Sequence, residues 1–426
     1  MSFAALALTA APAHAITLED ALQQTFSDNP DLDQARYGVS AANEDRNQAM
    51  AAYAPTMDIS GSYGTRNYET FQPNGLFGPV HNETKLAPST STARVQEQLY
   101  TGGRRRGRAD LARAGVSGAQ ITLRSTEQDV LLAAVQAYVS VYRDQQIVVF
   151  NQAYVDSLVR EVSGTQRRLE VGEVTRTDLS QAQARLAGAR ASLANSRSAL
   201  EASRAQFAQI IGLQPDDLAA PPPPPLVPDS LDAALLQASD HPRILLAHEN
   251  ETAADARIRI ERSARLPQLA LIARADRNED TQVLSDYQDS SSVGVQLSFP
   301  FYDGGFAWSR VRQARINLDS ARAASEARRR QTEADVIAKW NAAQAAHEML
   351  AAAQQQVQAS EDAFHGAQRE QGLGLRSTIE VLNAEQEWRQ AQIDLARAQA
   401  NDQTTAYQML SSIGTLSLDN LKSSEP

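Results

Sequence analysis

The chain of 426 residues carries 40 Lys and Arg against 51 Asp and Glu, and its formal charge of −11 argues against nucleic acid as a partner, because phosphate binding needs a basic surface. It contains no cysteine, which excludes disulfides, thiolate metal sites, cysteine nucleophiles and cysteine-linked lipid anchors. Beyond the N-terminus there is no run of about 18 apolar residues, so the sequence predicts no transmembrane helix.

The N-terminal segment, residues 1–15, has the pattern of a secretory signal peptide. Residues 3–11 form a short apolar run, and Ala13-His14-Ala15 follows with small residues at both key positions. We therefore expect cleavage after Ala15 and export of the protein, although the positively charged start of such peptides is missing. A buried apolar N-terminal segment is the alternative.

Two strands with alternating side chains are predicted between residues 55 and 100. In residues 55–67 apolar and small polar residues alternate, and residues 91–100 form the second strand. Ten-residue strands with one apolar face are typical of transmembrane barrels, and a half-buried soluble hairpin is the alternative. The segment between them, residues 67–90, is rich in Gly, Pro, Asn and Thr and is expected to form a surface loop.

A long helical hairpin is predicted over residues 104–212. This stretch contains no proline and is rich in Ala, Gln, Arg, Leu and Glu, and Gly172 marks a turn near its middle. At 1.5 Å per residue, the arm before the turn would be about 100 Å long. In the returning arm apolar residues recur every seven positions, which predicts a coiled-coil seam through Leu179, Leu186, Leu193, Leu200 and Phe207.

The second half of the chain repeats these landmarks in the same order. "SDNPDL" recurs as "SDHPRI", "LYTGGR" as "FYDGGF", and "TRTDLSQAQA" as "RSTIEVLNAE". This order predicts a tandem duplication, with a first repeat at residues 16–214 and a second at residues 229–414. Residues 215–228 between them contain five consecutive prolines and are expected to form an extended linker.

Each repeat is expected to contain a short helix, two strands and a helical hairpin. In the second repeat the strands fall within residues 266–301 and the helices within residues 306–412. The turn of this second helical hairpin is expected near Gly372 and Gly374, and residues 415–426 form a C-terminal tail.

Paired glycines are expected at both strand-to-helix junctions, where a turn requires a flexible backbone. These pairs are Gly102-Gly103 and Gly304-Gly305. Arginines follow the first pair in "TGGRRRGR", and we expect this basic run to face the periplasm or lipid headgroups. A phosphate-binding loop is the alternative.

This repeated order of elements resembles the TolC family of outer membrane efflux and secretion channels. The resemblance implies a mainly α fold with a β-barrel part, in which tandem-duplicated antiparallel helical hairpins form an α-barrel. In a homotrimer, four strands per protomer would form one twelve-stranded barrel in the outer membrane, and twelve helices would form a tunnel through the periplasm. It also implies a passive exit duct, not an enzyme and without a cofactor or metal, for a tripartite efflux pump or a type I secretion system. Its partners would be a periplasmic adaptor, an inner-membrane pump or ABC exporter, and outer membrane lipid.

The resemblance also implies a gate at the periplasmic helix turns. Thr177 and Asp178 in "TRTDL", and Arg376, Glu380 and Asn383 in "GLRSTIEVLNA", match polar positions that hold family channels closed. We expect Arg376 to pair with Asp178, and Glu380 to form an acidic ring with Asn383 as the second ring position. Simple stabilisation of helix N-termini by the two acids is the alternative explanation.

Two other functions are weighed against the channel. The chain has no H-E-x-x-H, G-x-S-x-G or P-loop motif, which argues against an enzyme. A periplasmic coiled-coil adaptor (membrane fusion protein) or structural protein would explain the heptads and the signal peptide. It would not explain two helical hairpins, each preceded by two amphipathic strands.

Overall fold

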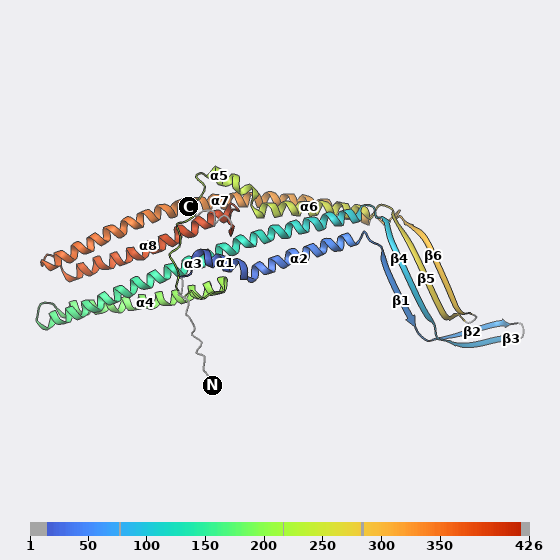
Figure 1. Ribbon diagram of the computed structural model, residues 1–426, viewed down its shortest axis with the longest axis horizontal. Helices are drawn as coiled ribbons and strands as arrows, with labels where there is room; N and C mark the ends of the chain where they lie inside the picture. Colours follow the sequence, from blue (N-terminus) through green and yellow to red (C-terminus); the bar gives the residue numbers. More distant parts are fainter. Residues whose placement is uncertain (1–14, 76–77, 216, 283–284, 419–426) are drawn as a thin grey trace, which may run out of the picture. The chain divides into compact units, whose positions relative to one another are not determined.

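The computed structural model of the protein describes residues 15–75, 78–215, 217–282 and 285–418 (Figure 1). Ala13, His14 and most of the predicted signal peptide therefore lie outside the described residues, as does most of the C-terminal tail. The chain divides into two compact units. We call them the helical unit (Met1–Tyr37, Ile121–Leu245, Ala327–Pro426) and the sheet unit (Gly38–Gln120, Leu246–Glu326).

Four antiparallel strands form the main sheet of the sheet unit, in the order β1-β4-β5-β6. Their bounds are β1 (Thr56–Tyr63), β4 (Ser89–Tyr100), β5 (Gln268–Gln282) and β6 (Ser285–Ser298). The strands come from the two stretches in which alternating side chains predict them, and the β4–β5 pairing joins these stretches.

The register gives the main sheet one apolar face and one polar face. One row across the four strands is apolar: Met57, Val95, Ala273 and Val293. The next row, on the opposite face, is polar: Asp58, Arg94, Arg274 and Ser292. Met57 and Val293 are 73% and 77% exposed in the single chain. An exposed apolar face of this kind marks an interaction surface for lipid or protein.

Residues 67–90, for which the sequence predicts a surface loop, instead form most of a second hairpin. Strands β2 (Arg66–Gly75) and β3 (Gly78–Leu86) pair antiparallel, with Phe71 opposite His81. The loop prediction is therefore wrong for this segment. The pairing of β2 with β3 is irregular between Gln72 and Gly75, and Pro73 lies in this interval. Because proline has no amide hydrogen, it is tolerated where no regular inter-strand hydrogen bond is required.

Two antiparallel helical hairpins dominate the helical unit (Figure 1). The first joins α3 (Arg104–Glu170) to α4 (Arg176–Ile211), and the second joins α7 (Phe306–Gly372) to α8 (Thr378–Ser412). Helices α3 and α7 begin in the sheet unit and have 67 residues each. At 1.5 Å per residue each is about 100 Å long.

The predicted heptad seam of α4 lies in the hairpin interface. Leu186, Leu193, Leu200 and Phe207 are buried, and Leu186 and Leu193 pack with Val155 and Leu158 of α3. Leu179, the first predicted seam residue, is only half-buried. The same spacing in α8 runs through Val381, Trp388, Leu395, Asp402 and Met409. Asp402, the one acidic residue among them, is buried, and its carboxylate lies 3.7 Å from Nδ1 of His347 on α7. Burial at every seventh residue explains why helices this long stay paired.

Short helices precede each strand segment. They are α1 (Leu18–Asp28) and α2 (Pro30–Ala51) in the first half, and α5 (Leu231–Gln237), the 3-10 turn η1 (Ala238–Asp240) and α6 (Pro242–Ser263) in the second. Asn29 Oδ1 accepts a hydrogen bond from the Asp31 amide at 2.9 Å, and His241 Nδ1 accepts one from the Arg243 amide at 3.1 Å. The two recurring landmarks thus cap the helix that begins at the following proline.

The core of the helical unit lies around Tyr138 of α3, which is fully buried beside Phe207. The Tyr138 hydroxyl lies 2.8 Å from the carbonyl oxygen of Ile16 and 2.7 Å from that of Ala219, so it joins the N-terminal segment to the linker. Burial raises the pKa of Tyr138, which keeps its hydroxyl a donor. None of the helices in the described part of the chain is long and apolar enough to cross a membrane.

Candidate gate at the helix turns

The first helix turn joins α3 to α4 and is built on Gly172, whose φ is +81°. A left-handed backbone of this kind favours glycine. Thr175 caps α4, and its amide and hydroxyl both donate to the Asp178 carboxylate at 2.8 Å. These hydrogen bonds lower the pKa of Asp178. Thr177 is exposed and makes no side-chain hydrogen bond within the described residues.

The second helix turn, between α7 and α8, repeats this construction. Gly374 has a φ of +74°, whereas Gly372 is the last residue of α7 and is not left-handed. Ser377 caps α8, and its amide donates to the Glu380 carboxylate at 2.9 Å. Hydrogen bonds from Ser377, helped by the nearby charge of Arg376, lower the pKa of Glu380.

Arg376 pairs within its own turn. Its Nε lies 2.5 Å from a Glu370 carboxylate oxygen, and its Nη1 lies 4.0 Å from Glu380. These partners, Glu370 first, raise the pKa of Arg376. The structure of one chain brings Arg376 and Glu380 together, but among its described residues Arg376 makes no ion pair with Asp178. That pairing remains a prediction.

One contact between the two helical hairpins comes from Arg185 on α4, which the sequence analysis does not single out. Its Nη2 donates to Asn383 Oδ1 at 2.5 Å, and its Nη1 donates to the Leu382 carbonyl at 3.2 Å and to Gln386 Oε1 at 3.1 Å. Asn383, a predicted gate residue, is therefore tied to the other hairpin. Arg185 stands seven residues after Asp178, on the same face of α4, and this spacing is the signal that could have found it.

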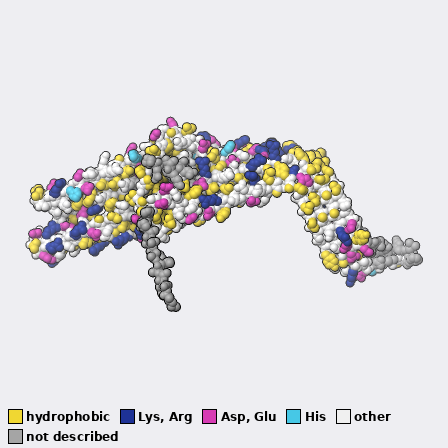
Figure 2. Space-filling model, in the orientation of Figure 1, with side chains coloured by type: hydrophobic (Ala, Val, Ile, Leu, Met, Phe, Trp, Pro, Cys, Tyr) yellow, Lys and Arg dark blue, Asp and Glu magenta, His cyan; other side chains and the backbone are white. Residues whose placement is uncertain are grey.

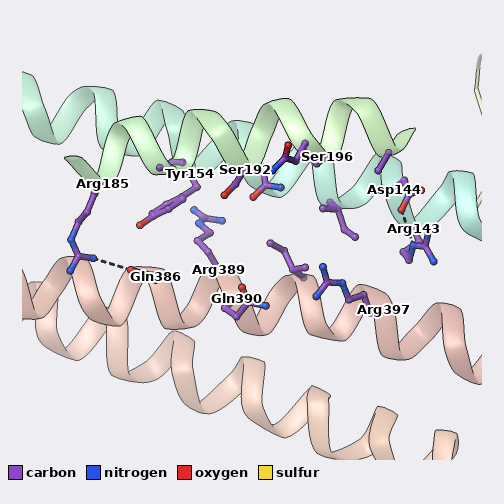
Figure 3. A pocket seen from close by; sticks show the side chains of 17 residues that line it. Arg143, Asp144, Tyr154, Arg185, Ser192, Ser196, Gln386, Arg389, Gln390 and Arg397 are labelled. Atoms are coloured by element: carbon purple, nitrogen blue, oxygen red, sulfur yellow. Dashed lines mark hydrogen bonds and ion pairs between the residues drawn. The ribbon is translucent and has the colours of Figure 1, made fainter. Parts of the chain in front are cut away.

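A cavity of about 850 Å³ lies between the two helical hairpins beside Arg185 (Figure 3). Tyr154 of α3, Ser192 of α4 and Arg389 of α8 point into it. Burial lowers the pKa of Arg389, whose guanidinium lies 4.3 Å over the Trp388 ring. Polar side chains are more numerous in the lining than in the apolar seams inside each hairpin, and apolar side chains such as Ile147 and Ile393 contribute to it as well.

The glycine pairs at the strand-to-helix junctions lie where the sequence places them. Gly102, Gly103, Gly304 and Gly305 all have a positive φ. The φ of Gly102 is +62°, which disfavours every residue other than glycine. A Cβ at this position would also lie 2.7 Å from Cβ of Leu266, so there is no space for a side chain. The junctions set the direction in which α3 and α7 leave the sheet.

Known proteins are similar to this chain in sequence and in fold. A profile of the outer membrane efflux protein family matches residues 21–213 and 236–415. The chain is 29% identical to the outer membrane efflux protein BepC of Brucella suis biovar 1, over 97% of this chain and 89% of BepC. It is 24% identical to the outer membrane protein TolC of Escherichia coli K12, over 94% of this chain and 82% of TolC. Its fold matches the CmeC outer membrane channel of Campylobacter jejuni with a TM-score of 0.82, at 16% identity, over 95% of this chain and 88% of CmeC.

These matches cover most of the chain, and the relatives are efflux, secretion and channel proteins rather than enzymes. They confirm the resemblance drawn from the order of the sequence elements. They also confirm an outer membrane location and a channel function, in place of the adaptor alternative. The chain belongs to the outer membrane efflux protein family, the TolC family of channels for efflux and secretion.

Proposed function

We propose that this chain forms a homotrimeric exit duct for a tripartite efflux pump or a type I secretion system. A periplasmic adaptor would dock on the helix turns, and an inner-membrane pump or ABC exporter would supply the energy. The observation that carries the trimer is the main sheet, which exposes one apolar face and ends in β1 and β6, each paired on one side only among the described strands.

Closure of the main sheet into a barrel accounts for its exposed apolar face and for its two edge strands. Open strand edges are not tolerated in lipid, because unpaired backbone groups there have no water to bind. Pairing β6 of one copy with β1 of the next would remove every edge and give twelve strands in three copies. The apolar rows would then face lipid, and the polar rows would line a water-filled pore.

Cross-linking tests this arrangement directly, since the chain has no cysteine of its own. Ser60→Cys on β1 is combined with Ser290→Cys or Ser292→Cys on β6, all on the polar face. We expect oxidation to give covalent trimers from at least one pair. The matched control is Ser60→Cys with Ser291→Cys, because a shift of one residue moves the second cysteine to the other face. Monomers from all pairs would contradict the closed trimer.

The gate is proposed to lie at the helix turns. Arg185 would hold the two hairpins of one copy together through Asn383, and Arg376 would pair with Asp178 of the neighbouring copy. Three Glu380 carboxylates around the trimer axis would favour cations. An Arg376→Ser channel that conducts no better than wild type in a planar bilayer would contradict the Arg376 part of this proposal.

A further inference from the structure

Arginines gather where the helices of the sheet unit meet the main sheet, although the whole chain is acidic. Figure 2 shows dark blue side chains concentrated at this level. Several of these arginines have carboxylate partners: Arg259 pairs with Asp110, Arg310 with Glu261, and Arg105 with Glu97. Of the arginines here that make no ion pair within the described residues, we consider four. We call these four the arginine collar: Arg104, Arg106, Arg108 and Arg265.

The collar lies beside the end of the apolar face. Glu97 on β4 is opposite Leu271, in the rows that carry the apolar side chains, and it lies 3.5 Å from Arg105. Arg105 also lies over the ring of Tyr53, at 4.7 Å from its centroid. The neighbouring collar arginines, Arg104 and Arg106, therefore stand at the border at which the apolar surface gives way to the helices.

Exposed aromatic side chains mark the same border. The guanidinium of Arg265 lies 3.1 Å from the centroid of the Trp308 ring, and Trp308 is 55% exposed. Further exposed aromatic residues here include Tyr53, Tyr100, Phe299, Phe301, Tyr302 and Phe306. Aromatic rings beside cations are the side chains that proteins place at the level of lipid headgroups.

We propose that the arginine collar binds the phosphate groups of anionic phospholipids in the periplasmic leaflet of the outer membrane. This inference rests on the proposed function, in which the main sheet spans that membrane. A guanidinium matches phosphate oxygens with two parallel hydrogen bonds, and its charge attracts an anionic headgroup. Arg106 and Arg108 are exposed and have no carboxylate partner, so they keep both capacities, whereas Arg259 and Arg310 are already paired with carboxylates. Arg104 is half-buried, and its Nη2 donates to Gln268 Oε1 at 3.3 Å, which leaves its charge without a carboxylate partner. Stacking on Trp308 holds Arg265 ready for a headgroup.

The test compares two variants of the same charge on the full-length protein. The collar variant is Arg106→Gln with Arg108→Gln, and the control is Arg160→Gln with Arg167→Gln, all exposed positions on α3. Each protein is placed in nanodiscs of phosphatidylcholine with or without phosphatidylglycerol, and retained phosphatidylglycerol is measured by native mass spectrometry. A second collar variant, Arg265→Gln, checks the site from a different element.

We expect wild type and the α3 control to retain phosphatidylglycerol, and the double collar variant to bind it roughly tenfold more weakly or worse. Equal retention by collar variant and control would overturn the proposal. Displacement of the lipid by millimolar inorganic phosphate would overturn it too, by assigning the site to a free anion. Wild-type protein that never enters nanodiscs would overturn the proposed function and the collar together, whereas insertion with no preference for phosphatidylglycerol would overturn the collar alone.

Discussion

At the scale of single residues, the acids of the two helix turns are held mainly by their own helix caps. Asp178 is bonded by Thr175, and Glu380 by Ser377. The capping explanation therefore accounts for why an acid stands at each position. A gating role requires a second set of contacts from another copy, which the proposed trimer would provide.

The first prediction concerns the pH dependence of the α4 cap. The pKa of Asp178 is lowered in the folded chain, so its carboxylate stabilises the cap of α4. This stabilisation is complete above the ordinary pKa of about 3.8 and is lost as the pH falls through the lowered pKa. We expect the Asp178 amide, which donates to Thr175 Oγ1, to exchange faster at acidic pH than intrinsic rates explain. Hydrogen exchange of the detergent-solubilised protein measures this. Asp178→Asn should abolish the pH effect, and an unchanged effect in that variant would contradict the assignment.

A second prediction concerns the link between the hairpins. Arg185→Gln removes the charged donor to Asn383 and to the Leu382 carbonyl, and should shift the closed-to-open equilibrium by about 1 kcal/mol, roughly fivefold. Planar-bilayer recordings should show a higher open probability. Arg190→Gln, an exposed position on the same helix, is the matched control and should behave like wild type. Equal openings in the two variants would show that Arg185 does not hold the gate.

At the scale of elements, the long helices and their seams could be predicted from the sequence, because heptad spacing and the absence of proline are local signals. The β2–β3 hairpin could not, because its Gly, Pro and Asn residues are typical of loops, and only the pairing of the two strands overrides this local preference. Arg185 was missed for another reason. The spacing of seven residues places Arg185 on the same face of α4 as Asp178, but its partners lie on α8, and only the packing of the two hairpins decides which faces meet.

The third prediction tests the coiled-coil seam at its most buried position. Phe207 is fully buried, with its ring centroid 6.3 Å from that of Tyr138. Phe207→Ala should lower the free energy of unfolding by about 3–5 kcal/mol, through lost burial and the cavity that remains. Thermal unfolding followed by far-UV circular dichroism measures the loss. Gln206→Ala, at the neighbouring exposed position, should change stability little, and a comparable loss there would contradict the seam assignment.

At the scale of the whole molecule, a single chain leaves two kinds of surface unsatisfied. The main sheet has an apolar face exposed and two edge strands with one neighbour each. The alternation of side chains predicts the four strands, but the register that aligns Met57, Val95, Ala273 and Val293 in one row is visible only in the structure. Assembly of three copies within a membrane would cover the apolar face with lipid and pair the two edge strands with those of neighbouring copies. The proposed trimer therefore rests on the main sheet.

Single-channel recording of the detergent-purified protein in a planar bilayer, with its mass measured in parallel, shows whether three copies of the chain form a channel with a closed tip. The account predicts a trimer with small, cation-preferring conductance, because polar rows would line the pore and Glu380 would stand at its closed end. Arg185→Gln and Arg376→Ser should each increase that conductance. A monomer or dimer that stays in solution without detergent and conducts no current would contradict the channel, the trimer and the gate together.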